Sequence, residues 1–229
     1  MIKLLDECKH GRLGNKLLQN VGISVLSKIY NLYPEYHEIP ENNLIGLNLY
    51  YGKNINLNFV RYDEPDCDKK LLDQKIEIDH GIIYNGYFQD KFLSVCYKNL
   101  VDEVIIKRKI KKYNEVFVHV RLGDVSHINP GILYYKNILN SISFEDGLIS
   151  SDSIDDLIVR QLSEEYNLKI FNSSPIDTIM IGSEYEHRVL SGGSFSWWIG
   201  YLGDNNNVFC PSRPDYYGVG LRNPEWNIR

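Results

Sequence analysis

The sequence predicts an α/β protein built on parallel sheets, and three observations support this prediction. Runs of apolar β-forming residues alternate along the chain with helical stretches. The alternation falls into two blocks that divide near residue 110, and the second block is the more regular. The first strand of that block, Val116–Val120, ends in the polar stretch "HVRLGD", and ligands of open α/β sheets bind at the carboxyl ends of strands. We expect two α/β domains, residues 1–110 and 111–229.

The first block opens with a short strand, Met1–Leu5, and then a helix. Apolar residues recur there at three- and four-residue spacing, which predicts a helix from about Asn15 to Tyr30 with one buried stripe. The stripe consists of Leu18, Val21, Val25, Ile29 and Leu32. Prolines interrupt the polar region 33–80. The other elements expected in this block are a strand near Ile55–Val60, a strand or turn at Gly81–Tyr87 and a helix from about Gln89 to Lys109.

The second block repeats strand and helix in a regular order. Its first strand is apolar and β-branched, and Gly123 ends it. The elements expected after it are helix Tyr134–Ile142, strand Gly147–Ser150, helix Ile154–Tyr166, strand Leu168–Phe171, helix Ile176–Ile181, strand Arg188–Leu190 and a helix that begins at Ser196 or Trp197. This alternation indicates a parallel sheet with helices on both faces.

Composition and charge argue against several classes of function. The 229 residues carry a net charge of −5, so the chain lacks the basic excess that nucleic-acid binding requires. We expect the one basic cluster to be a solvated helix end with at most a peripheral attraction to anionic membrane. It consists of Lys107, Arg108, Lys109, Lys111 and Lys112. The four cysteines lack metal-site or disulfide spacing, and there is no signal peptide or apolar run of about 18 residues, which favours a soluble, reduced, cytoplasmic protein.

Two short motifs are each compatible with a site or with ordinary structure. "HGRLGN" at His10–Asn15 joins the first strand to the helix, so its glycines and the helix start suit an anionic or polar ligand, but a tight turn has the same pattern. "DCD" at Asp66–Asp68 has the form used by metal-dependent nucleotide-sugar enzymes, but its polar surroundings favour a solvated loop. The histidines are scattered, and we expect no metal.

The stretch Ser191–Gly203, "SGGSFSWWIGYLG", is more informative. Its two glycines free the backbone, and Ser194 or Ser196 is a suitable N-cap for the apolar helix that follows. The N–H groups of that helix start, with two hydroxyls, would form an anion pocket, although a capped core helix gives the same pattern. Arg121 can grip a phosphate bidentately, so the two junctions together would hold a diphosphate without a metal.

Six motifs occur in order along most of the chain. They are "GRLGNKLLQ" at 11–19, "NGYFQDKFL" at 85–93, "HVRLGD" at 119–124, "YYKNIL" at 134–139, "ISSDS" at 149–153 and "SGGSFSWW" at 191–198. Together they resemble the motifs of the alpha-1,2-fucosyltransferase family. The departures are Leu122 for a second arginine, Val125 for a tyrosine, Lys16 for a glutamine and Gly192-Gly193 for Asn-Ser. The chain is also short for the family, so the donor site carries over better than the acceptor site.

The resemblance implies a GT-B-like fold, in which two Rossmann-like domains with parallel sheets face each other across a cleft, with the first domain reduced here. It implies an inverting transfer of L-fucose from GDP-fucose to a hydroxyl of a glycan acceptor, with no metal and no cofactor. Residues 1–110 would form the acceptor side, and residues 111–229 would bind the donor. The implied partners are a nucleotide-sugar donor and a glycan acceptor.

The resemblance also implies roles for single residues. Arg121 would bind the β-phosphate and stabilise charge on the departing GDP, and His119 would touch the nucleotide or fix Arg121. Asp124 is the first candidate for the catalytic base, but it would also hold Arg121, and we favour that role. The other donor-site residues are the helix start Ser194, Phe195 and Ser196, the guanine-side carboxylates Asp152 and Asp177, and Gly14 and Asn15 from the first domain.

Two alternatives stay open at this point. One keeps the fold but uses another nucleotide sugar, because Leu122 and the short first domain depart from the family. The other is a non-catalytic module that binds a sugar or nucleotide. The presence of Arg121 argues against a module, because acceptor binding alone needs no diphosphate clamp.

Overall fold

The structure is a computed structural model that describes residues 1–7, 11–54, 58–64, 68–89, 97–124, 126–204, 206–212, 223 and 225–228. The described residues form two compact units, one within Met1–Ile106 and the other from Lys107 onward. Each unit contains a parallel sheet and helices, so the predicted α/β class is confirmed. None of the helices that the structure describes has the length and apolar character required to cross a membrane.

The first unit has a three-stranded parallel sheet in the order β1-β3-β2. Its elements are β1 (Ile2–Leu4), α1 (Leu13–Tyr30), α2 (Glu41–Leu44), β2 (Phe59–Asp63), a π-helical segment (Asp68–Asp73), β3 (Gly81–Asn85) and α3 (Lys98–Val104). Helix α1 is buried throughout residues 17–27 and packs against β1 and α3. The prediction of a single buried stripe was wrong, because α1 is covered on all sides over these residues, Ile29 is only partly buried and Leu32 lies beyond the helix. Gly14 and Asn15 lie in the first turn of α1.

The helix expected over Gln89–Lys109 is shorter than predicted. Its described part, α3, ends at Val104, because Ile105 turns to extended backbone and forms an antiparallel bridge with Leu47. Residues 90–96 lie outside the described part of the chain. The apolar spacing continued past the true end of the helix because Ile105 is buried by a strand-like contact and not by a helical one.

The basic cluster after α3 is therefore not a helix end. It leads into the first strand of the second unit, and nearby groups take up much of its charge. Arg108 and Lys111 both pair with Glu184. The ammonium of Lys107 lies over the ring of Tyr201, 3.2 Å from the ring centroid.

The second unit has a six-stranded, fully parallel sheet in the order β6-β5-β4-β7-β8-β9. The strands are β4 (Lys112–Val120), β5 (Asp146–Ser151), β6 (Lys169–Ile170), β7 (Tyr185–Leu190), β8 (Val208–Cys210) and β9 (Asn227–Ile228). Numbered from β4, this is the strand order 3-2-1-4-5-6 of a doubly wound, Rossmann-type sheet. The order reverses between β4 and β7, and a crevice forms at such a reversal.

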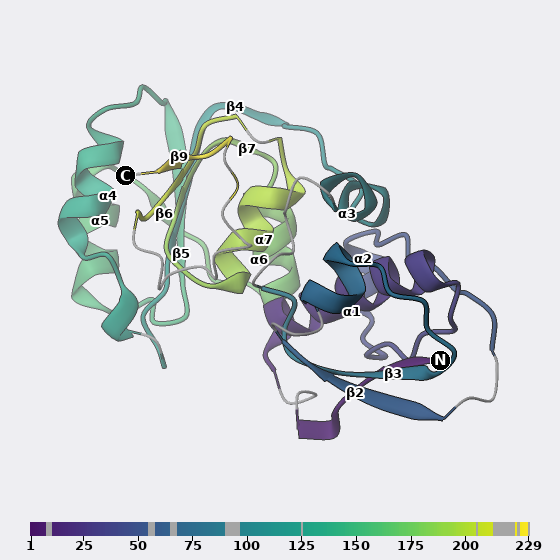
Figure 1. The fold of residues 1–229 in the computed structure, drawn as a ribbon. Helices are drawn as coiled ribbons and strands as arrows, with labels where there is room; N and C mark the ends of the chain where they lie inside the picture. The colour runs from purple at the N-terminus through teal and green to yellow at the C-terminus, as the bar shows by residue number, and fades with distance from the viewer. Residues whose placement is uncertain are drawn as a thin grey trace. The chain divides into compact units, whose positions relative to one another are not determined.

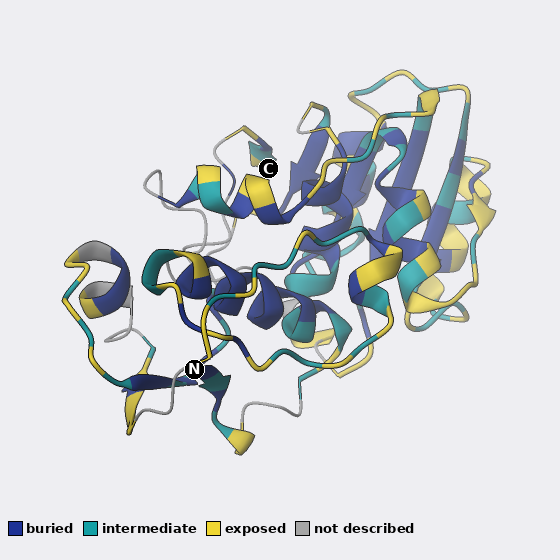
Figure 2. Cartoon of the chain, turned by 90° about the vertical axis from the view of Figure 1, so that its right-hand side faces the viewer, coloured by how far each residue is buried: buried dark blue, intermediate teal, exposed yellow. Residues whose placement is uncertain are grey.

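Helices cover both faces of this sheet (Figure 1). They are α4 (Ile132–Leu139) and α5 (Leu157–Glu165) on one face, α6 (Pro175–Gly182) and α7 (Ser194–Leu202) on the other, and a short 3-10 helix at Ser126–Ile128. The sheet is buried along most of its central strands (Figure 2), which explains why the second half of β4, residues 116–120, is mostly apolar. Val118 and Val120 pack into the cluster that includes α4 and α5, so His119 between them faces α7.

The last two strands, β8 and β9, were not predicted. They have three and two residues, which is too short for a period of two to be recognised. The other strands of this unit occur where the alternation predicted them, within a few residues at each end.

Candidate functional site

A pocket of about 370 Å³ lies at the carboxyl edge of the second sheet. Its walls come from the ends of β4 and β5, the residues after β6, the first turns of α6 and the start of α7. Residues that line it include His119, Arg121, Asp152, Asn172, Thr178 and Phe195. The strand order reverses beside β4, so this pocket occupies the position at which open α/β sheets bind ligands.

His119 joins the end of β4 to the start of α7 through buried hydroxyls. Its Nδ1 lies 2.7 Å from Ser196 Oγ, and Ser196 Oγ lies 3.1 Å from Ser191 Oγ. Ser191 Oγ also accepts the backbone N–H of Arg121 at 3.0 Å. Burial, with a smaller contribution from the charge of Arg121, lowers the pKa of His119 to about 4. His119 is therefore neutral at pH 7, and Ser196 and Ser191 connect it to the backbone N–H of Arg121.

Arg121 is held by two carboxylates. Its Nη1 donates to Asp152 Oδ2, and its Nη2 donates to Asp124 Oδ1 at 2.6 Å. Its side chain is only 16% exposed, so the guanidinium has one preferred place at the edge of the pocket. This geometry agrees with the holding role that we favoured for Asp124.

Asp152 fixes the turn after β4 as well as the guanidinium. Its Oδ1 accepts the N–H of Leu122 at 2.9 Å, while Oδ2 accepts from Arg121. A Cβ at Gly123 would overlap Asp152 Oδ2, so glycine at this position lets the carboxylate approach. Both oxygens of Asp152 are thus engaged within the protein.

Helix α7 begins at Ser194, and its N-cap differs from the prediction. The N-cap is Gly193, with φ +93°, and it provides no side-chain capping hydrogen bond. Ser194 or Ser196 as N-cap was wrong, because the glycine adopts a backbone conformation that side chains disfavour and Ser196 turns its hydroxyl to His119. Phe195 lines the pocket, so the positive end of the helix dipole lies beside it.

The structure brings most of the predicted donor-site residues together. His119, Arg121, Asp124, Asp152, Ser194, Phe195 and Ser196 all lie at the carboxyl edge of the second sheet or at the start of α7. Asp177 is exposed in the first turn of α6 and accepts hydrogen bonds from Ser173 and Ser174. It acts as part of the cap of that helix, since Ser174 in turn accepts the N–H of Asp177.

Gly14 and Asn15 belong to the first unit. Gly14 is buried in the first turn of α1, and Asn15 Oδ1 accepts a hydrogen bond from Gln89 Nε2 at 3.1 Å. The predicted approach of these two residues to the donor stays a prediction. His10, the first residue of that motif, lies outside the described residues.

Sequence reasoning did not assign several polar residues of the site, among them Ser191, Asn172 and Thr178. Asn172 follows β6, and Ser191 follows β7, so the rule that ligands bind after parallel strands would have selected both. Thr178 gave no such signal, because it stands in the second turn of α6 and only the fold turns it to the pocket.

The candidate metal motif is not tested by the structure. Asp66 and Cys67 lie outside the described residues, and Asp68 begins the π-helical segment. Among the residues that are described, no three His, Cys, Asp or Glu side chains gather in a way that could hold a metal ion.

Comparison of the chain with known protein families gave no matching family, and comparison with curated proteins gave no relative. The function must therefore be argued from the geometry of the pocket and from the motifs of the chain itself.

Proposed function

We propose that the protein is an inverting glycosyltransferase that moves L-fucose from GDP-fucose to a hydroxyl of a glycan acceptor, and that it needs no metal. The observation that carries the proposal is the position of Arg121. It stands at the carboxyl edge of a Rossmann-type sheet, at the strand reversal, in a pocket shared with the start of α7. The order of the six motifs supports GDP-fucose as the donor.

The chemistry of the transfer explains why these groups are needed. When the acceptor hydroxyl attacks the anomeric carbon, the bond to the diphosphate breaks and negative charge grows on the departing phosphate oxygen. A guanidinium that is already in place stabilises this charge more in the transition state than in the ground state. The positive end of α7, where the N-cap Gly193 provides no side-chain cap, acts in the same direction.

The acceptor hydroxyl must lose a proton during the attack, and no group is assigned to that step. Asp124 was the first candidate, but its Oδ1 is bound to Arg121. His119 is neutral, but its Nδ1 is bound to Ser196. In the GT-B-like arrangement that we propose, the first unit provides the acceptor side. The catalytic base would then be a group on that side.

A second candidate keeps the pocket and the reaction but uses another nucleotide sugar. It is favoured by the state of the two carboxylates that were expected to read guanine. Asp152 uses both oxygens within the protein, and the carboxylate of Asp177 accepts hydrogen bonds from Ser173 and Ser174. The groups left in the pocket to contact a nucleobase would then be hydroxyls and amides, such as those of Thr178 and Asn172, and these groups suit more than one nucleobase.

Calorimetric titration with GDP, UDP and ADP in the presence of a chelator tests the proposal. We expect GDP to bind best and the chelator to have no effect. Tighter binding of UDP or ADP would favour the second candidate, and no binding of any nucleotide would refute both. Transfer is then measured as release of GDP from GDP-fucose with a panel of free sugars as acceptors. The product should have the anomeric configuration opposite to that of the donor.

A further inference from the structure

The charges around Arg121 do not favour an anion in the state that the structure shows. Among the described residues that line the pocket, Arg121 and Asp152 are the charged ones, and they pair with each other. Asp124 adds a second negative charge on the same guanidinium, so the three groups carry a net charge of −1. A diphosphate that enters this pocket would meet two carboxylates that already use the arginine.

The two carboxylates are held to different degrees. Asp152 directly follows β5, its side chain is 24% exposed, and it is tied to the backbone of Leu122 as well as to Arg121. Asp124 lies in the turn after β4, and its side chain is 49% exposed. An ion pair with such an exposed partner contributes little to stability, because water and salt screen it. Of the two, Asp124 is the more exposed, and it is the one that an incoming phosphate would displace from Arg121.

The atoms that Asp124 occupies are those that a phosphate needs. Nη2 and Nε lie on one edge of a guanidinium and form a fork that matches two phosphate oxygens. Nη1 is taken by Asp152, and Nε makes no hydrogen bond with any residue that the structure describes. Release of Nη2 by Asp124 would therefore complete a free fork, while Asp152 continues to hold the other side of the guanidinium.

We propose that Asp124 is an internal competitor of the donor diphosphate: its carboxylate binds Nη2 of Arg121 when no donor is bound and releases it when a phosphate binds. This inference rests on the proposed function, because it requires an anionic donor. Asp124 then affects both the binding and the release of the nucleotide. The carboxylate weakens the grip on the nucleotide, and it returns to Arg121 as the nucleoside diphosphate departs, so that product release is faster than the guanidinium alone would allow.

The test compares Asp124→Asn with wild type in calorimetric titrations of GDP and of inorganic pyrophosphate. Loss of the competitor should tighten binding of both about two- to fivefold, the range that corresponds to an exposed ion pair. The gain should shrink at high salt, where the pair is screened. In an Arg121→Ala background, Asp124→Asn should give no gain, because the site of competition is absent. Asp124→Ser is a second variant with the same expectation.

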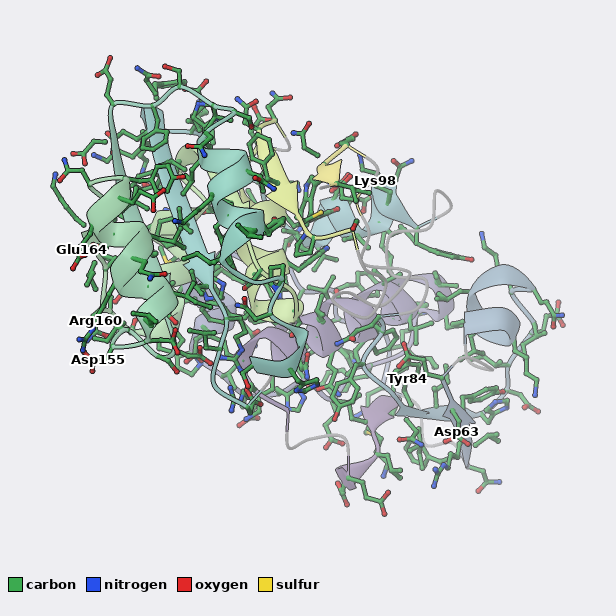
Figure 3. The ribbon with its side chains drawn as sticks, turned by 90° about the vertical axis from the view of Figure 1, so that its left-hand side faces the viewer. Asp63, Tyr84, Lys98, Asp155, Arg160 and Glu164 are labelled. Carbon is green, nitrogen blue, oxygen red and sulfur yellow. The ribbon has the colours of Figure 1, made fainter. Side chains whose placement is uncertain are left out.

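Asp155→Asn is the matched control. It removes a negative charge from the segment between β5 and α5, where Asp155 is 90% exposed and pairs with Arg160 (Figure 3). A gain equal to that of Asp124→Asn would show a general effect of charge and overturn the proposal. Weaker or unchanged binding by Asp124→Asn, with wild type binding GDP, would overturn the competitor but not the proposed function. Absence of binding in both proteins would overturn both.

Discussion

The neutral state of His119 makes the stability of the fold depend on pH in a defined window. Burial lowers the pKa of His119 to about 4, whereas the same side chain in the unfolded chain titrates near 6.5. Between these values the unfolded state binds a proton that the folded state does not, so the free energy of unfolding falls as the pH falls. The difference in pKa corresponds to about 3 kcal/mol, which is fully present above pH 6.5 and lost by about pH 4.

Substitution His119→Gln isolates this effect, because glutamine does not titrate and can still hydrogen-bond Ser196. Urea unfolding is measured at about pH 7 and about pH 4.5, and the loss of stability between them should be about 2–3 kcal/mol smaller in the variant than in wild type. His127→Gln, at an exposed position, is the control and should behave like wild type. Equal losses in all three proteins would refute the reasoning, since they would show that His119 takes up its proton as easily folded as unfolded.

Three further predictions concern the turn after β4 and the carboxylates near it. Gly123→Ala pushes a methyl group against Asp152, so GDP affinity measured by calorimetry should fall roughly tenfold, and unchanged affinity would contradict the positioning role of Asp152. Asp177→Ala should lower the free energy of unfolding by about 1 kcal/mol through loss of the hydrogen bonds that Ser173 and Ser174 donate to its carboxylate, with the ratio of GDP to UDP affinity unchanged. A smaller ratio of GDP to UDP affinity in the variant would show that Asp177 contacts the nucleobase. Arg121→Ala should lower the rate of GDP release from GDP-fucose by roughly 10²–10⁵. Arg121→Lys should recover little, because the fork is lost, and a folded variant with wild-type turnover would remove the arginine from the mechanism.

The regular alternation of strands and helices could be predicted from the sequence alone. The second half of β4, residues 116–120, is buried and mostly apolar because α4 and α5 cover one face of the sheet and α6 and α7 the other, and such a run is recognised without any alignment. The short strands β8 and β9 have too few residues to show a period. The end of α3 was misplaced because burial of Ile105 by Leu47 gives the same apolar signal as burial on a helix face.

The candidate site was predictable in position but not in its internal contacts. The rule of strand ends selects Arg121 and Asp152 separately, because each follows a strand. That they pair depends on β4 and β5 being neighbours in register, with Val120 opposite Ser151. A chain with another strand order could contain the same motifs and keep the two residues apart. For the same reason the guanine role expected of Asp152 could not be weighed before the sheet order was known.

In the stretch "HVRLGD", charged residues directly follow a buried strand, because its side chains alternate between the two faces of the sheet and the chain then turns. His119 faces α7 and ties it to the strand, whereas Val120 points to the opposite face and belongs to the core. Arg121 reaches the pocket, the N–H of the next residue holds Asp152, and Gly123 leaves room for that carboxylate. Gly123→Ala, which disturbs the pairing of Asp152 with Arg121, and Arg121→Ala, which removes the guanidinium, should therefore act on the same contact. Their effects on nucleotide affinity should not add, because each removes the pairing that the other depends on.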